Sequence, residues 1–286
     1  MPRTSALTRA LSLAAAAAAA IALAGCTAGE TAEQSDAPAA TASEFVTDGK
    51  LTIGTGEPAY FPWVLDDAPE SGEGFESAVA YAVAEELGFA ADDVVWVRTT
   101  FDQAIAPGPK DFDFNLQQFS ITDERKEAVD FSSPYYETTQ TVITIEGSRA
   151  AGATSIADLK NLSIGAQTGT TSLAAIESQI APAGGAQVFN TNDDAKLALQ
   201  SGTVDAIVVD LPTAFYLTGA ELTGGLIIGQ LPQTAGTGDE FGLVLAKDSP
   251  LTERVTAAVD TLRENGTLDA LAEEWLASAA EAPVLE

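Results

Sequence analysis

Arg125 is the first residue of chemical interest, because basic side chains are scarce in this chain. The sequence has 13 Lys and Arg residues against 42 Asp and Glu residues. Arg125 follows Ser120 by five residues, across a predicted turn from a strand to a helix. A guanidinium can hold a carboxylate through two parallel charge-assisted hydrogen bonds, so this position is a candidate anion clamp. The alternative is a surface pairing of Arg125 with Asp123, Glu124 or Glu127.

Two further groups stand at the ends of predicted elements. Thr170 and Thr171 follow Gly169 immediately before a predicted helix. Free backbone N–H groups and the positive end of the helix dipole suit a carboxylate there, although a threonine can also simply cap the helix. Asp210 ends the apolar strand AIVV and precedes Leu-Pro. From its position alone, Asp210 could cap the helix that follows.

The composition excludes several classes of function. The chain of 286 residues has a formal net charge of -29, no histidine and one cysteine. This charge argues against nucleic-acid binding and against a polybasic membrane-surface protein. The absence of histidine excludes Ser-His-Asp and Cys-His catalysis and the usual zinc sites, and one cysteine excludes an internal disulfide. These exclusions leave carboxylate chemistry, a hard-cation site or binding without catalysis. Of these, we favour one that needs no metal and no cofactor.

The first segment of the chain is predicted to be a targeting signal. Residues 1–25 contain no acid, and their two arginines precede an apolar run over 11–23. This run is shorter than the roughly 20 residues of a membrane-spanning helix. This run ends in LAGC, which looks like a bacterial lipobox, so we expect lipidation of Cys26 after cleavage. An ordinary signal peptide with a chance cysteine is the alternative. Residues 26–47 are rich in small and polar residues and predict a flexible tether.

The body of the chain alternates between strand-like and helix-like segments. Such alternation predicts an α/β architecture with mostly parallel sheets. The expected strands are residues 50–55, 94–98, 112–116, 140–145, 162–166, 187–189, 206–209 and 241–246. The expected helices are residues 75–87, 123–129, 155–159, 171–180, 191–201, 212–218, 249–265 and 268–277.

The alternating pattern runs twice, which predicts two lobes joined by two crossover strands. The first lobe is expected to comprise residues 48–137 plus 234–278, and the second residues 138–233. Residues 279–286 are expected to form a C-terminal tail. Ligands of open α/β sheets lie outside the carboxyl ends of strands, so the ligand cleft is expected between the lobes.

The body also resembles a known family, the family 3 solute-binding proteins of ABC importers, which bind polar amino acids. The resemblance covers about residues 50–276 and implies a two-lobed fold like that of type II periplasmic binding proteins. The segment SITDERKEAVDFSSPYY is its most specific part. The matching segments are GTGEPAYFPW (54–63), GFESAVAYAVAEELG (74–88), SITDERKEAVDFSSPYY (120–136), IGAQTGTTS (164–172) and VDAIVVDLPTAFYL (204–217).

The resemblance implies how the backbone groups of an amino acid are held. Arg125 matches the arginine that clamps the ligand's α-carboxylate, and Ser120 adds its hydroxyl or backbone N–H. Thr170 and Thr171 match the second lobe's grip on the same carboxylate. Asp210 matches the residue that binds the α-ammonium, in agreement with the need of a zwitterion for an anion opposite its cation clamp.

Other positions are implied for the ligand side chain. Tyr60 and Phe101 resemble the two aromatics that sandwich it, although isolated aromatics are more often core residues. Glu57 matches an acid that contacts its polar end, which hints at a cationic or hydrogen-bond-donating side chain. Gln118 departs from the family, because many members have Gly or Ser there; it could donate, accept or shrink the pocket. If the strand continued, Gln117 would lie on the face opposite to Gln118.

We therefore expect a non-enzymatic binding lipoprotein that delivers an amino acid with a polar or cationic side chain to an ABC permease. It is expected to be monomeric, anchored through Cys26 on the extracytoplasmic face of the membrane, and not to bind nucleic acid. Two alternatives remain. The first is a sensing module for a separate receptor, and the second is a dehydratase-like enzyme in which Glu57 and Asp210 form an acid–base pair.

Overall fold

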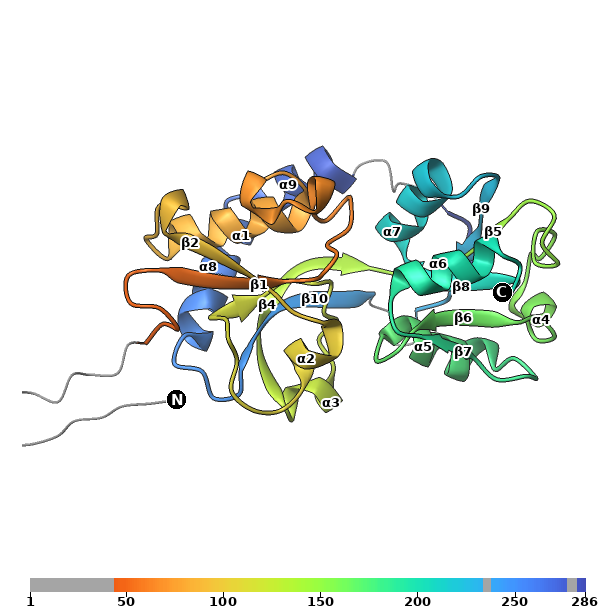
Figure 1. Cartoon of the computed structure of the whole chain (residues 1–286), viewed down its shortest axis with the longest axis horizontal. Coiled ribbons are helices and arrows are strands. Elements are labelled where there is room, and N and C mark those ends of the chain that lie inside the picture. Colours follow the sequence, from red (N-terminus) through yellow and green to blue (C-terminus); the bar gives the residue numbers. More distant parts are fainter. Residues whose placement is uncertain (1–43, 234–237, 277–281) are drawn as a thin grey trace, which may run out of the picture. The chain divides into compact units, whose positions relative to one another are not determined.

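The structure is a computed structural model that describes residues 44–233, 238–276 and 282–286 (Figure 1). The predicted signal segment, Cys26 and most of the predicted tether lie outside these residues. Within them, no helix has both the length and the apolar character needed to cross a membrane.

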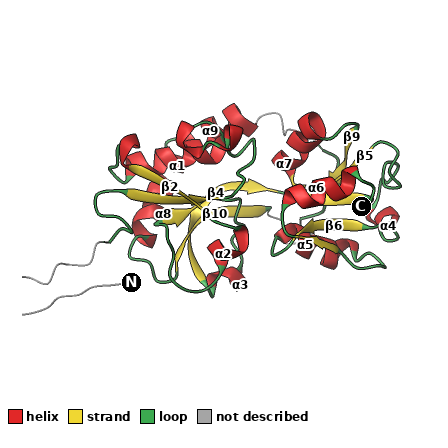
Figure 2. Ribbon diagram, in the orientation of Figure 1, coloured by secondary structure: helices red, strands yellow, loops and turns green. Residues whose placement is uncertain are grey.

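The described chain forms two mixed five-stranded sheets, one in each of two lobes, which confirms the predicted fold class (Figures 1 and 2). In each sheet, three strands run parallel and the remaining pairings are antiparallel. The first sheet has the order β2 (Val94–Arg98), β1 (Leu51–Thr55), β3 (Phe114–Asn115), β10 (Asp239–Ala246) and β4 (Val129–Thr138). The second has the order β7 (Gln187–Phe189), β6 (Ile164–Gln167), β8 (Ala206–Asp210), β5 (Gln140–Ile145) and β9 (Gly225–Gln230).

Short helices flank both sheets (Figure 2). Most lie within the expected helical segments, but α2 was not predicted, and the helix expected over 123–129 ends at Lys126. Threonine and serine side chains begin several of them; Thr122, Thr191 and Ser155 each accept a backbone N–H in the first turn. The helices are α1 (Phe75–Glu86), α2 (Phe101–Ile105), α3 (Asp123–Lys126), α4 (Ile156–Leu159), α5 (Thr171–Ala175), α6 (Asn192–Gln200), α7 (Leu211–Tyr216), α8 (Thr252–Glu264) and α9 (Thr267–Leu276). Helices α5 and α7 continue as single π-helical turns over Ile176–Ile180 and Leu217–Glu221.

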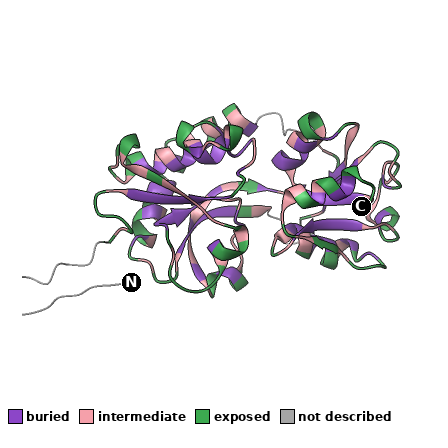
Figure 3. Ribbon diagram, viewed as in Figure 1, coloured by how far each residue is buried: buried purple, intermediate pink, exposed green. Residues whose placement is uncertain are grey.

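Each sheet is buried along its central strands (Figure 3). All five residues of β1 and all four of β6 are buried, as expected for parallel strands covered on both faces. In the first lobe, α1, α8 and α9 pack on one another and bury an aromatic and aliphatic core around Phe75 and Phe241. Central strands held this firmly fix the positions of the loops that leave their ends, and these loops carry the predicted ligand-binding residues.

The chain leaves the first sheet after β4, enters the second at β5, and re-enters the first at β10. Residues 282–286 then also lie on the second sheet. The N–H of Gln230 donates to Pro283 O at 2.7 Å, and the N–H of Leu285 donates back to Gln230 O at 2.8 Å. The Leu285 side chain is 2% exposed and belongs to the core of the second lobe. The described part of the predicted C-terminal tail is therefore an integral part of that lobe.

Candidate functional site

One pocket draws residues from both lobes and contains most of the predicted ligand-binding positions. Its enclosed free space is about 40 Å³. The strand ends and helix starts that line it are those that the α/β topology brings together, as expected for a binding site in this class of fold. The predicted residues that line this pocket are Tyr60, Phe101, Gln118, Ser120, Arg125, Thr170, Thr171 and Asp210. Their contacts with a ligand remain predictions.

The guanidinium of Arg125 is buried at the wall of the pocket. Arg125 is 9% exposed and donates from NH1 to Ser120 O at 2.7 Å and from NH2 to Gly169 O at 2.8 Å. The guanidinium carbon also lies 5.3 Å from the centroid of the Phe101 ring. These partners are neutral and come from both lobes, and no carboxylate of the described residues forms an ion pair with Arg125. This arrangement differs from the surface pairing that we considered as an alternative.

Charges around Arg125 oppose the effect of its burial. Burial lowers the pKa of Arg125, whereas the nearby carboxylates of Asp239, Asp210 and Glu124 raise it. An arginine side chain keeps its proton in proteins. The pocket therefore presents a permanent cation that would attract a carboxylate.

The start of α5 closes the pocket on the side of the second lobe. The Thr170 hydroxyl accepts the N–H of Leu173 at 3.2 Å and donates to Gln167 O at 2.7 Å, so Thr170 caps the helix. The Thr171 hydroxyl lies 3.1 Å from the Ser120 hydroxyl of the first lobe. The predicted capping role is therefore present, and Thr171 also makes a contact between the lobes.

Asp210 is the acidic counterpart of Arg125 in the pocket. Its position precedes α7, but its side chain makes no capping hydrogen bond to that helix. Instead, its Oδ1 accepts from Gln140 Nε2 at 2.8 Å, and the same nitrogen donates to Asp239 Oδ2 at 2.8 Å. Burial and the charge of Asp239 raise the pKa of Asp210 to about 7, against the opposing effect of Arg125. A bound cation would favour the ionised form of this carboxyl.

The aromatic residues and Glu57 were predicted to surround the ligand side chain. Tyr60 and Phe101 both line the pocket, and Phe101 also packs on the core residue Phe119 with ring centroids 4.7 Å apart. Burial and the charge of Asp193 raise the pKa of Tyr60, so its hydroxyl stays neutral. Glu57 is exposed and does not line the pocket, so its contact with the ligand stays a prediction.

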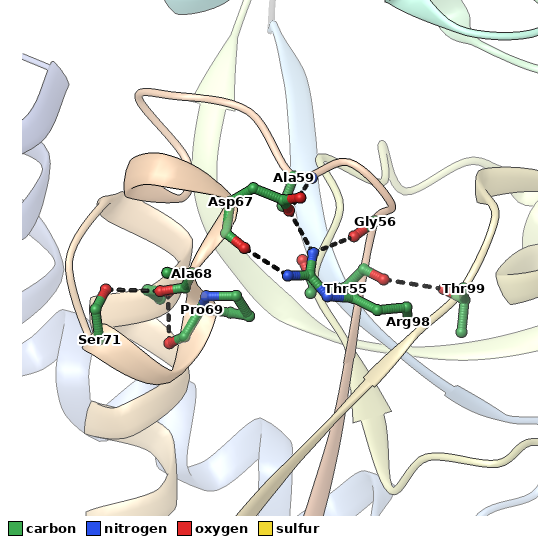
Figure 4. A network of polar contacts seen from close by, with 10 residues as sticks. Thr55, Gly56, Ala59, Asp67, Ala68, Pro69, Ser71, Arg98 and Thr99 are labelled. Carbon is green, nitrogen blue, oxygen red and sulfur yellow. Dashed lines mark hydrogen bonds and ion pairs between the residues drawn. The ribbon is translucent and has the colours of Figure 1, made fainter.

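The loop that carries Tyr60 is fixed by Arg98 at the end of β2 (Figure 4). Arg98 donates to Gly56 O at 2.7 Å, and to Asp67 Oδ1 and Asp67 O, each at 2.6 Å. Asp67 Oδ1 in turn accepts the N–H of Ala59 at 2.8 Å. The guanidinium thus joins both ends of the loop and positions the pocket residues between them.

Gln118 reaches a buried carboxylate that the sequence did not reveal as part of the site. Its backbone has φ 52°, a left-handed conformation that glycine adopts far more readily than other residues. Its N–H donates to Glu76 Oε1 at 2.8 Å, and its side-chain amide donates to Glu76 Oε2. The Tyr135 hydroxyl also donates to Glu76. Glu76 lies in the helix expected over residues 75–87, and nothing in its sequence context predicts this role.

Gln117 lies in the same pocket as Gln118, contrary to the alternation that we expected from a continuing strand. The strand β3 ends at Asn115, and the left-handed residue Gln118 breaks the period of two. The Gln117 side chain lies over Gly56, where an added Cβ would be 2.9 Å from Gln117 Nε2. Gln117 Oε1 is buried and has no hydrogen-bond partner among the residues that the structure describes. A buried acceptor of this kind is available to a ligand.

Other lining residues were not predicted, because their sequence context is ordinary. Several lie at the end of β1, at the end of β6 or at the start of α6. The end of a strand or helix has no sequence signal of its own. These residues are Thr55, Gly56, Pro58, Ala59, Gln117, Gln167, Ser172, Asn192 and Val209. Within the described parts of the chain, no group of three or more Cys, Asp or Glu side chains could hold a metal ion.

Comparison with known proteins assigns this architecture to a family. The profile of the bacterial extracellular solute-binding proteins, family 3, matches residues 51–278. An L-arginine-binding protein of Pseudomonas aeruginosa is 32% identical over 228 residues, which cover 78% of this chain and 86% of that protein. An ABC transporter glutamine-binding protein of Bacillus subtilis is 26% identical, with coverage of 73% and 75%.

Solved structures agree with these sequence relatives. An ancestral arginine-binding protein bound to glutamine has a TM-score of 0.67 and 31% identity, and the match covers 80% of this chain and 98% of that one. The relatives named here are binding proteins rather than enzymes. With a family profile that spans most of its length and both lobes in place, the chain belongs to the bacterial extracellular solute-binding proteins of family 3.

Proposed function

We propose that this protein captures a free amino acid in the pocket between its lobes and delivers it to an ABC permease. Arg125 carries the proposal, because a buried and permanently charged guanidinium faces a pocket without a carboxylate bound to it. In the same pocket, Asp210 supplies an anion. One cation and one anion in a single pocket complement the α-carboxylate and α-ammonium of an amino acid.

The contacts between the lobes support capture by opening and closing. Ser120 approaches Thr171, and Arg125 donates to Gly169, so the residues proposed to hold the carboxylate also join the lobes. About 40 Å³ of free space holds a few water molecules but not an amino acid. The lobes must therefore separate for the ligand to enter, and the ligand would then rebuild these contacts through its own carboxylate.

The relatives support the choice of partner. One of them is named as the glutamine-binding protein of an ABC transporter, and others are named for arginine, histidine or cystine. We infer that the present protein acts in the same way as a monomer, with an amino acid as ligand and a membrane permease as partner. An enzymatic role is not favoured, because Glu57 lies outside the pocket and cannot act there with Asp210 as an acid–base pair.

The lipid anchor is a separate proposal that rests on LAGC, residues 23–26. A diacylated Cys26 would hold the protein stably at the extracytoplasmic face, because two acyl chains suffice where one is marginal. Incorporation of a labelled fatty acid into the wild-type protein, and its loss in Cys26→Ser, would support the anchor. Equal labelling of both proteins would refute it.

The ligand class can be tested by thermal shift of the purified protein against each of the twenty amino acids. A ligand that binds only the folded form raises the apparent stability by mass action, by about 2.7 kcal/mol at a concentration of 100 times Kd. We expect at least one amino acid to raise Tm and the rest to have little effect. If no amino acid changed Tm and calorimetry also detected no heat, the proposed function would be wrong.

A further inference from the structure

We infer that the side chain of the ligand is uncharged and polar, carrying a primary amide or a hydroxyl, and is not cationic. This inference rests on the proposed amino-acid function and narrows it. It concerns the part of the pocket beyond Arg125 and Asp210, where the ligand's side chain would lie against Tyr60, Gln117 and Asn192. The relatives that are named for arginine do not decide this point, because their names describe their own ligands.

The charges of the pocket are already balanced by the backbone groups of an amino acid. Among the described residues, Arg125 is the only basic side chain that lines the pocket and Asp210 is the only carboxylate. The α-carboxylate pairs with Arg125 and the α-ammonium with Asp210. A further carboxylate, Asp239, shares Gln140 Nε2 with Asp210 but lies outside the pocket lining. A second cation on the ligand would then be buried without an anion, which costs far more than the burial of a neutral polar group.

Acidic residues near the pocket are turned to other partners. Asp67, which contacts the loop of Tyr60, forms an ion pair with Arg98 at 2.6 Å. Asp193, beside Asn192, pairs with Lys196 at 2.8 Å. Glu57 is exposed and lies outside the lining. Asp193 also hydrogen-bonds Tyr60, but its carboxylate is shared with Lys196, and none of these three carboxylates lines the pocket.

The hydrogen-bonding groups of this region complement a neutral polar side chain. Gln117 Oε1 is buried and lacks a partner, so it calls for a donor from the ligand. Gln167 and Asn192 also line the pocket, and each offers an amide that can donate and accept. A ligand amide or hydroxyl both donates and accepts, so it can satisfy Gln117 and one of these amides together.

The first test is calorimetry on the wild-type protein with glutamine, asparagine, serine and threonine against arginine and lysine. We expect the best uncharged ligand to bind about tenfold more tightly, or better, than either basic amino acid, since an unmatched buried group costs about 1–3 kcal/mol or more. Binding of arginine or lysine with affinity equal to or above that of the uncharged set would overturn the inference. That result would leave the amino-acid function intact. If none of the six bound, or if only apolar amino acids bound among the twenty tested by thermal shift, the assignment of the side chain would be wrong.

The second test changes the charge at the proposed contact. Gln117→Glu places a carboxylate in the side-chain region and should shift the ratio of arginine to glutamine affinity toward arginine by about tenfold or more. Gln187→Glu is the matched control, because Gln187 is exposed on β7 and does not line the pocket. It changes the net charge by the same amount and should leave the ratio unchanged. Equal ratios in the two variants, with both folded by circular dichroism, would remove Gln117 from the site.

Discussion

At the scale of single residues, Glu76 has the most unusual environment. It is 2% exposed at the start of α1, and it receives hydrogen bonds from Gln118 and from the Tyr135 hydroxyl. Burial raises its pKa to about 7, although these donors act in the opposite direction. Glu76 thereby holds Gln118, a pocket residue, in a left-handed backbone conformation that few side chains adopt. It is a positioning residue that does not itself line the pocket.

The raised pKa of Glu76 predicts a pH-dependent stability. The pKa of Glu76 is 4.5 in the unfolded chain and about 7 in the folded protein, so the folded protein binds the proton more strongly. Its contribution is therefore complete below the unfolded pKa and is lost as the pH rises through about 7. From pH 4.5 to pH 8 we expect wild type to lose about 3 kcal/mol more unfolding free energy than Glu76→Gln.

Urea unfolding without ligand at the two pH values measures this difference. Glu124→Gln is the control, because Glu124 is exposed on α3 and the substitution removes the same charge. It should keep the pH dependence of the wild-type protein. The assignment fails if Glu76→Gln and Glu124→Gln respond to pH alike.

At the scale of elements, the sequence predicted the strands and helices with strong patterns. The helix around Phe75 and the strand AIVV appear where periodicity and burial placed them. The strand β4 escaped prediction, because its sequence VDFSSPYYET is polar and contains Pro134. It is held instead by its long antiparallel pairing with β10, with register shifts beside Gly242. Such a pairing is a tertiary feature that local sequence does not display.

The site shows the same division between local and tertiary information. Residues at strand ends and helix starts, such as Arg125 and Asp210, were predicted from their position and from the family resemblance, and they line the pocket. Gln117 was expected on the face opposite to Gln118, because the sequence does not show the left-handed backbone of Gln118 that breaks the alternation. Glu76 was missed because an acid in the first turn of a helix is usually a solvated residue near the positive end of the helix dipole.

The segment after α9 gives a prediction at the scale of elements. Leu285 is buried in the core of the second lobe, whereas its neighbour Val284 is 60% exposed. Leu285→Ala should lower the unfolding free energy by about 2–4 kcal/mol, because it removes buried methyl groups and leaves a cavity. Val284→Ala should change it by about 0.5 kcal/mol or less. Equal effects of the two substitutions in urea unfolding would show that this segment does not contribute to the core.

At the scale of the whole molecule, the two lobes meet through the residues proposed to hold the ligand. Arg125 belongs to the first lobe and donates to Gly169 of the second, and the Ser120 and Thr171 hydroxyls approach from opposite lobes. A carboxylate bound at these groups would therefore contact both lobes at once. Binding and closure are thus expected to occur together. The closed, ligand-bound form is the one that a permease would recognise.

The central claim, that Arg125 clamps the carboxylate of an amino acid, is tested most directly by calorimetry on Arg125→Ala. The titrant is the amino acid that stabilises the wild-type protein most, and Arg254→Ala is the control, since Arg254 is exposed and pairs only with Glu44 among the described acids. Circular dichroism verifies that both variants fold. We predict that Arg125→Ala weakens binding by about 30-fold or more while Arg254→Ala retains wild-type affinity. An affinity of folded Arg125→Ala equal to that of the wild type would contradict the account.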